Sequence, residues 1–414
     1  MHWLKLSLLP LSLMAILAAG LYALAQNGQT KPARPADLKV DGRVTGAIND
    51  LGFRLFAEMS RADGDKNIFI SPASIELALA MTYNGAGGTT KTAMAKAMGL
   101  GALTLDDVNK GNAQLLSLLK SPDPKVELAI ANSLWGRQGL TFKQDFLRRV
   151  GTSYQAKLTT LNFAKPQAAD TINTWVSDNT RGKIPTLVDP PMLEDAVLVL
   201  VNAIYFKGAW TTPFDTKQTQ DGPFTLANGT KKTMPMMRQR DSLRYLETES
   251  FQAVSLPYGE GNVVMDVILP KPGVTPAAFH GSLTAANWNR WARQFRSREG
   301  MIVMPRYKAQ FETSLKPALT ALGMGIAFTD NASFPGLLEG VQKRLLISDA
   351  IHKTVLEVNE EGTVAAGVTG VVVGVTSMPM DPPFEMVVDR PFFVTIRDNP
   401  TGVLLFMGMI NNPE

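Results

Sequence analysis

The 414-residue sequence contains no cysteine and only three histidines. Without cysteine there are no disulfides, no thiol nucleophiles and no cysteine metal ligands, so the folded chain depends on its core for stability. His2 falls in the N-terminal leader, which leaves His280 and His352 for any catalytic triad or metal site. No HExxH motif occurs, so the sequence does not indicate a zinc site.

Short catalytic motifs are incomplete. In "GAGGTTKT" (85–92), Thr90 stands where a phosphate-binding loop needs the glycine before its lysine. "SLLK" (117–120) matches the Ser-x-x-Lys pattern of penicillin-binding enzymes, but the companion motifs SDN and KTG are missing. "GMGIAF", from Gly323, lacks the third small residue of a dinucleotide-binding turn. We therefore expect no enzyme, no catalytic residue, no cofactor-binding residue and no metal site.

Charge is neither abundant nor one-sided. Charged residues make up 19% of the chain, hydrophobic residues 45%, and the formal net charge is +4. These are values of a globular protein with a sizeable core. The densest basic run, "RWARQFRSR" (290–298), includes two aromatic residues, which favours an amphipathic surface helix over polyanion binding. We expect no nucleic-acid partner.

The first residues are typical of export. His2 and Lys5 precede an apolar run over 6–24, and "ALA" (23–25) forms a small-x-small cleavage site before Gln26. We predict a signal peptide over 1–25 and a flexible leader over 26–40, with an uncleaved anchor as the alternative. The mature chain would be secreted, into the extracellular space, or periplasmic, with no membrane partner once the signal is removed.

Helical spacing dominates the first half, and strands dominate the second. Apolar residues from Val44 to Met59 recur at helical spacing, and Ser71 with Pro72 predicts the capped start of another helix. Residues 125–135 alternate as a strand with one wet face, whereas 196–210 is apolar on both alternations, as in a strand covered on both faces. Without regular βαβ alternation, this order predicts an α+β fold with antiparallel or mixed sheets.

One stretch fits none of these elements. From Gly362 to Met380 there is no charged residue, although three glycines interrupt the valines and alanines. The stretch is too long for an ordinary buried strand, in which each interior glycine would cost about 0.5–1 kcal/mol relative to alanine. Its glycines, threonines and neighbouring prolines also make it a poor membrane span.

Five segments, in order, resemble the serpin family from residue 44 to the C-terminus. They are "NIFISPASI" (67–75), "INTWVSDNTRGKI" (172–184), "LVNAIYFKGAWTTPF" (200–214), "AIHKTVLEVNEEGTVAAG" (350–367) and "DRPFFVTIRDNPTGVLLFMGMINNP" (389–413). The resemblance implies a single serpin domain over 41–414, in an exported and bacterial-type member. It implies three β-sheets, about eight or nine helices, and an exposed reactive-centre loop at about 361–383.

The resemblance also implies a function. A serpin inhibitor is a suicide substrate: a target serine protease, sometimes a cysteine protease, cleaves the loop, and the loop inserts into the central sheet with the enzyme still bound covalently. Inserted side chains that face the core must be small or uncharged. The hinge residues implied here are Glu360, Gly362, Thr363, Ala365 and Ala366. The protein is expected to be a monomer with a risk of polymerisation, because the loop can add to another molecule's sheet.

Family spacing places the reactive bond between Thr376 and Ser377, with Val375 and Met378 as alternatives. Small β-branched side chains fit a shallow specificity pocket, so elastase-like targets are favoured over trypsin-like ones. The alternative function is a non-inhibitory serpin, a carrier, storage or chaperone-like protein whose loop never inserts.

Other positions carry over from the family one at a time. Ser71, Ser74, Asn202 and His352 match the shutter, the polar group beneath the central sheet. Trp210 matches the breach, where insertion starts, and Arg306 is expected to pair there with Glu360. For His352, this structural role is favoured over a catalytic one, because no nucleophile and acid accompany it in a known motif.

Overall fold

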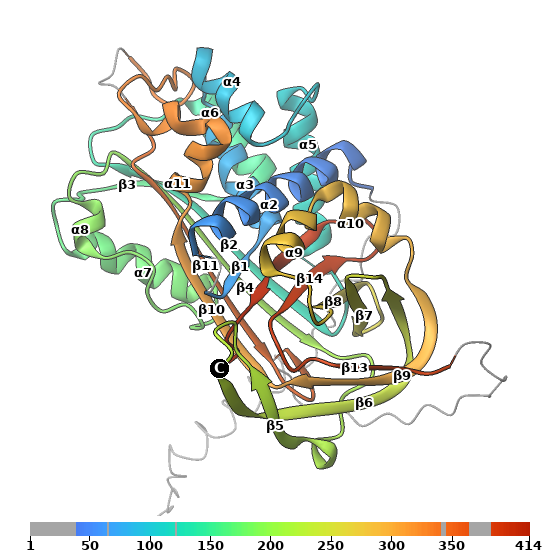
Figure 1. Ribbon diagram of the computed structural model, residues 1–414. Coiled ribbons are helices and arrows are strands. Elements are labelled where there is room, and N and C mark those ends of the chain that lie inside the picture. Colours follow the sequence, from blue (N-terminus) through green and yellow to red (C-terminus); the bar gives the residue numbers. More distant parts are fainter. Residues whose placement is uncertain (1–38, 64–65, 121, 341–344, 364–381) are drawn as a thin grey trace, which may run out of the picture.

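The computed structural model describes residues 39–63, 66–120, 122–340, 345–363 and 382–414 (Figure 1). The described chain holds ten α-helices: α2 (Gly42–Asp63), α3 (Pro72–Tyr83), α4 (Gly88–Ala97), α5 (Leu105–Leu119), α6 (Gln144–Tyr154), α7 (Gln167–Asn179), α8 (Pro190–Leu193), α9 (Pro276–Ser282), α10 (Ala285–Ala292) and α11 (Lys316–Leu319). Three single-turn segments are η1 (Thr216–Gln218), η2 (Thr320–Met324) and η3 (Gly325–Phe328).

The strands fall into two sheets. One has nine strands: β1 (Ile68–Ile70), β15 (Leu404–Ile410), β14 (Phe392–Asp398), β8 (Val263–Pro270), β7 (Phe251–Tyr258), β6 (Lys231–Glu247), β9 (Arg296–Pro305) and β13 (Phe384–Val387), with β5 (Gln220–Thr225) paired to β6. The other has six: β10 (Tyr307–Ser314), β11 (Asp349–Val358), β4 (Leu198–Ala209), β2 (Val126–Arg137) and β3 (Lys157–Leu161), with β12 (Gly362–Thr363) paired to β4.

The mixed helices and sheets confirm the predicted α+β fold. The resemblance implied three sheets, whereas the described strands form two hydrogen-bonded sheets, because β6 is long enough to pair with β5 and β9 and then with β7. The helix count exceeds the expected eight or nine by including α8 and α11, each of four residues.

The helix α3 forms as its sequence predicts. The Ser71 side chain accepts a hydrogen bond from the Ser74 N–H at 3.3 Å, and Pro72 occupies the first turn. A proline is tolerated there because its missing N–H would have no partner inside the helix. Every residue from Pro72 to Tyr83 is buried, so α3 lies in the core beneath the six-stranded sheet.

The six-stranded sheet is covered on both faces. Helix α3 lies against one face, and α7 crosses the other (Figure 1). Ile172 and Val176 of α7 share an apolar cluster with Val199 and Val201 of β4 and with Ile351 of β11. The strand β4 is buried over nearly its whole length, as its apolar residues on both alternations predict.

Two local expectations are wrong. The strand β2 was expected to have one wet face, but only its first residues keep one: Ser133 and Trp135, on the same face as Glu127, are buried, and the Trp135 ring packs against Trp175 of α7. The basic run over 290–298 is not one helix: α10 ends at Ala292 and β9 begins at Arg296. None of the described helices is both long and apolar enough to cross a membrane.

The strands β1 and β15 approach so closely at Gly408 of β15 that no side chain fits there. A Cβ at this position would lie 1.9 Å from the Ile68 carbonyl oxygen. We expect Gly408→Ala to lower the free energy of unfolding by about 1–3 kcal/mol, the usual cost of overpacking. Gly46, in α2, has nothing within 4 Å of a Cβ, so Gly46→Ala should instead stabilise by about 1 kcal/mol. Equal effects of the two variants in urea titrations would contradict this packing.

Candidate functional site

The predicted hinge starts at a backbone position that requires glycine. Gly362 has φ +145°, and a Cβ there would lie 2.1 Å from the Gly208 carbonyl oxygen. Gly362 and Thr363 form β12, which pairs antiparallel with Ala209 and Gly208 of β4. Two residues near the start of the predicted loop are thus already paired with the six-stranded sheet.

Thr363 is bonded to a tyrosine that stacks on a tryptophan. Its side chain is fully buried, and its hydroxyl lies 2.9 Å from the Tyr258 hydroxyl. The Tyr258 ring stacks on Trp210 with 4.2 Å between centroids, and the indole N–H of Trp210 donates to the Asn359 carbonyl at 2.9 Å. Burial raises the pKa of Tyr258 well above its usual value, so this hydroxyl keeps its proton and can take part in the bond to Thr363.

Glu360 makes the expected approach to Arg306, but its main partner is Thr219. Arg306 Nη1 lies 3.7 Å from Glu360 Oε1, whereas the Thr219 hydroxyl donates to the same oxygen at 2.8 Å. The Arg306 side chain is 52% exposed, so the ion pair should contribute only about 0.2–1 kcal/mol. The hydrogen bond from Thr219 is therefore the tighter hold on this carboxylate.

The remaining loop positions lie outside the described residues. These are the hinge residues Ala365 and Ala366, the reactive-bond residues Thr376 and Ser377, and the alternatives Val375 and Met378. Their roles stay predictions.

The four predicted shutter residues lie together in the structure. Ser71 and Ser74 are on the first turn of α3, while His352 and Asn202 are opposite each other on β11 and β4. The Asn202 side-chain amide donates to the Ser74 carbonyl at 2.8 Å and to Asn132 Oδ1 at 2.6 Å. Asn132 is on β2, so the hydrogen-bonded residues Ser71, Ser74, His352, Asn202 and Asn132 span three strands. We call this set the row.

Hydrogen-bond directions fix the tautomer of His352. The Ser71 backbone N–H donates to Nε2 at 3.1 Å, so Nε2 carries no proton. The proton is therefore on Nδ1, which lies 2.5 Å from Asn202 Oδ1 and donates to it. Burial lowers the pKa of His352 to about 3, and the ring is neutral at physiological pH.

The row crosses the place where β4 and β11 meet. These strands pair in parallel from Val199 opposite Asp349 to Tyr205 opposite Val355, and we call this pairing the seam. The bond between His352 and Asn202 spans the seam, and the α7 side chains cover its other face. A strand inserted between β4 and β11 would separate both the backbone pairing and this side-chain bond.

Sequence reasoning missed three residues of the site: Asn132, Tyr258 and Thr219. Asn132 carries a usable signal, because asparagine is depleted in strands and here follows an apolar run. Tyr258 and Thr219 carry none, since they lie more than 100 residues before Thr363 and Glu360 and meet them only in the fold.

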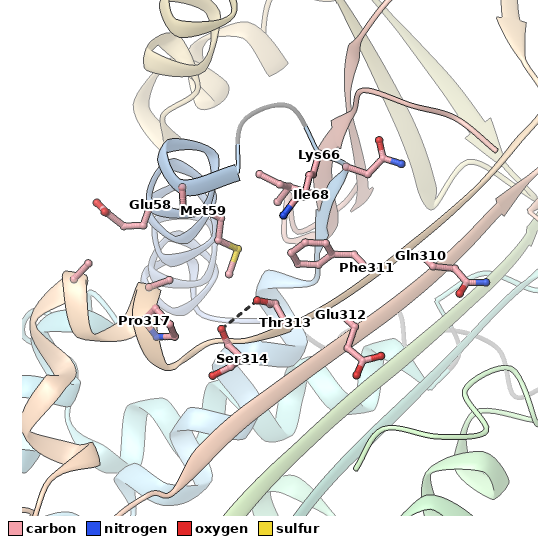
Figure 2. Close-up of a pocket in the computed structure, with 14 residues that line it drawn as sticks. Glu58, Met59, Lys66, Ile68, Gln310, Phe311, Glu312, Thr313, Ser314 and Pro317 are labelled. Carbon is pink, nitrogen blue, oxygen red and sulfur yellow. Dashed lines mark hydrogen bonds between the residues drawn. The ribbon is translucent and has the colours of Figure 1, made fainter. Parts of the chain in front are cut away.

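A cavity of about 660 Å³ lies between α2, β1, β10 and α11 (Figure 2). Met59, Ile68 and Phe311 are among its apolar lining, with Glu58 and Glu312 on its rim. No shutter or breach residue of the described chain lines this cavity, so it is separate from the insertion site.

The site thus combines a neutral buried histidine, bonded across the seam, with a glycine that pairs with the C-terminal end of β4. The family model described as serpin (serine protease inhibitor) matches residues 46–413. The chain belongs to the serpin family.

Known proteins similar to this chain include an elastase inhibitor and a thyroxine-binding protein. Leukocyte elastase inhibitor from Sus scrofa is 34% identical over 385 residues, which cover 90% of this chain and all of the relative. Neuroserpin from Homo sapiens is 32% identical over 378 residues, 89% of this chain and 91% of the relative. The structure of human thyroxine-binding globulin, solved with its ligand, superimposes with a TM-score of 0.81 at 29% identity, covering 89% of this chain and 98% of that one.

These findings confirm the serpin family and fold. They leave export and bacterial type as predictions, together with the division into signal peptide, leader and domain.

The neutral state of His352 predicts a pH dependence. Its pKa is lowered from 6.5 to about 3. Between these pH values the histidine is protonated in the unfolded chain but not in the native protein. Its contribution to stability is complete above pH 6.5 and is lost as pH falls toward 3. The loss by pH 5 is about 2 kcal/mol.

We expect His352→Leu to destabilise the protein at pH 7.5, because Asn202 Oδ1 and the Ser71 N–H lose their partner. The difference in unfolding free energy between wild type and variant should then shrink by about 2 kcal/mol from pH 7.5 to pH 5. Urea titrations at several pH values measure this. A difference that stays constant with pH would show that His352 is not held neutral.

Proposed function

We propose that this serpin inhibits serine proteases as a suicide substrate. The catalytic serine of the target attacks the carbonyl carbon of Thr376, and an acyl-enzyme forms as the amino group of Ser377 leaves. The freed segment then inserts between β4 and β11, carrying the acylated protease with it. The chain supplies no catalytic residue of its own, and insertion is the step that competes with hydrolysis of the acyl-enzyme.

The pairing of Gly362 and Thr363 with β4 supports this proposal most directly. Their antiparallel register runs from Ala209 to Gly208, so the next residues along β4 lead toward Tyr205, where the seam begins. Insertion would therefore extend a strand that has already started. Opening the seam would exchange the pairing of β4 with β11 for pairing of both strands with the inserted segment.

The composition of the segment supports insertion as well. From Gly362 to Met380 it carries no charge, so no ionised side chain has to be buried when alternate residues face the core. The glycines at 367 and 370 lose more entropy on ordering than alanines would. We expect this to slow insertion and to let a fraction of the chain be cleaved as an ordinary substrate.

We propose elastase-like proteases as targets, secreted or periplasmic in the same compartment as the mature chain. The residue before the reactive bond, Thr376, is small and β-branched, and no lysine or arginine occurs over 362–380. Met378 as the bait would instead favour chymotrypsin-like enzymes. The name of the relative from Sus scrofa, an elastase inhibitor, supports the same class of target.

The experiment is to mix the purified chain with elastase-, chymotrypsin- and trypsin-like serine proteases and to analyse the products on a denaturing gel. A covalent band near the summed mass, strongest with elastase, is the expected result. Cleaved chain alone would favour the carrier function, for which the similarity to thyroxine-binding globulin is the supporting observation. Mass spectrometry of the released fragment identifies the reactive bond.

Thr363 offers a direct test of insertion. Its side chain is fully buried against Tyr258, and an arginine there would bury an unpaired charge at a cost of several kcal/mol. We expect Thr363→Arg to lose at least 90% of its covalent complex while the loop is still cleaved. Thr89→Arg, at an exposed position on α4, is the matched control and should retain it. Normal complex formation by Thr363→Arg would rule out insertion through this hinge.

A further inference from the structure

The helix α3 contains one charged residue, Glu76, in a segment that is otherwise apolar or neutral. Its side chain is buried, with 1% exposure, among residues of α5 and α6. A charged carboxylate is stable in such a place only if it is paired or accepts several hydrogen bonds. Glu76 forms no salt bridge with any described residue, so it has neither protection.

Glu76 accepts one hydrogen bond, from Asn112 of α5. Asn112 Nδ2 donates to Glu76 Oε1 at 3.2 Å. The other oxygen of each group, Glu76 Oε2 and Asn112 Oδ1, is buried and has no donor among the described residues. The Glu76 carboxyl and the Asn112 amide therefore share one hydrogen bond, and each has a second oxygen without a donor.

The neighbouring donors are already engaged. The Tyr154 hydroxyl donates to Asn109 Oδ1 at 2.6 Å, and Asn109 Nδ2 donates to Asn84 Oδ1 at 2.9 Å. Asn84 Nδ2 donates to the Ala80 carbonyl and to Asn109 Oδ1. Hence the Tyr154 hydroxyl and the Asn84 amide have no proton left for Glu76 or for Asn112.

A single proton on Glu76 would satisfy both orphan atoms. We propose that Glu76 is protonated in the native protein, that its Oε2–H donates to Asn112 Oδ1, and that this closes a two-point acid–amide pair between α3 and α5. Loss of the proton opens the pair and leaves a carboxylate with one hydrogen bond inside the core. The pair is thus a proton-controlled contact on the helix whose first turn carries Ser71 and Ser74.

The pH range follows from burial. Desolvation raises the pKa of Glu76 to about 7, although the hydrogen bond from Asn112 opposes this rise. The native protein therefore holds a proton between about pH 4.5 and 7 that the unfolded chain releases. The contribution of Glu76 to stability falls as pH rises through this range and is level above it.

Tyr154 is the titratable group that interacts with Glu76, since the carboxylate adds to the burial that raises the pKa of this hydroxyl. The other charged groups on elements packed against α3 are engaged elsewhere, exposed or toward its ends. On α2 they include Arg43 paired with Asp41, Asp50 paired with Arg54, and Glu58 paired with Arg61. On α4, Lys91 lies over the Tyr83 ring and Lys96 is exposed. On α5 are Asp106, Lys110 and Asp107, which is bonded to Thr104. On α6, Asp145 pairs with Arg148, and Arg149 donates to the Asn84 carbonyl. The strands carry Glu127 near Arg181 and Arg137 on β2, Lys207 on β4, and, on β11, neutral His352, Asp349 bonded to Ser314, Lys353 paired with Glu312, and Glu357 near Lys183 and Lys308.

Infrared spectroscopy of the full chain tests the proton directly. At pH 6 the ordinary carboxyls are ionised, so the C=O stretching band of a protonated carboxylic acid should report Glu76. We expect this band at pH 6, its loss with a midpoint near pH 7, and its absence from Glu76→Gln. Glu299→Gln, at an exposed site, should keep it. A native wild-type protein with no such band at pH 6 would overturn the proposal.

Glu76→Gln also mimics the closed pair, because a glutamine amide can donate to Asn112 Oδ1 and accept from Asn112 Nδ2. In heated samples, we expect the ratio of the rate at which wild type loses its native state to the rate for Glu76→Gln to be several-fold larger at pH 8 than at pH 6, because His352 titrates in both proteins and cancels in the ratio. If Glu76→Gln does not fold, Asn112→Leu keeps the carboxyl but removes its partner. The band should then shift, and an unchanged band would contradict the pairing.

The consequence for inhibition rests on the proposed function, since α3 supports the seam that insertion would open. The infrared readout does not rest on it. A titrating Glu76 in a protein that forms no covalent complex would leave this inference standing and reject the inhibitor. Covalent inhibition without the infrared band would support the inhibitor and reject the protonated Glu76.

Discussion

The seam between β4 and β11 is the constraint on which the rest of the structure depends. Its backbone pairing is closed by the His352–Asn202 hydrogen bond, supported from below by the first turn of α3 and covered from above by α7. The side chains of Ser71, Ser74, Asn202 and His352 are all hydrogen-bonded in this row, and Asn132 Nδ2 is a buried donor without a partner among the described residues. Such a network favours one arrangement of the strands. The same network would have to be separated for a further strand to enter, so the closed sheet would hold back the insertion that we propose.

Two protons act on this region in opposite senses. His352 binds less proton in the native protein than in the unfolded chain between about pH 3 and 6.5, whereas Glu76 binds more between about pH 4.5 and 7. In the shared range their effects on stability have opposite slopes. The wild-type protein can therefore show a weak pH dependence that conceals two strong ones, and only single substitutions separate them.

The sequence predicted individual helices and strands better than the contacts between elements that are distant along the chain. The cap at Ser71 and the buried strand over 198–209 follow from local patterns, because capping and two-sided burial leave marks in neighbouring residues. The shutter came from the resemblance to serpins, since nothing local links Ser71 to His352. The hydrogen bond between Tyr258 and Thr363 depends on tertiary packing. So does the pairing of β6 with β5, β9 and β7, which joins these strands in one sheet. Glu76 is a charge in an apolar helix, a visible anomaly whose partner on α5 only the fold reveals.

The account rests on a native sheet that is less stable than the same sheet with its own loop inserted. The most direct measurement compares melting temperatures of the intact protein and of protein nicked once between residues 375 and 378. Insertion predicts a large rise in melting temperature on nicking, because the severed segment becomes a central strand paired on both sides. Equal melting temperatures, with the nicked chain still folded, would contradict the central claim.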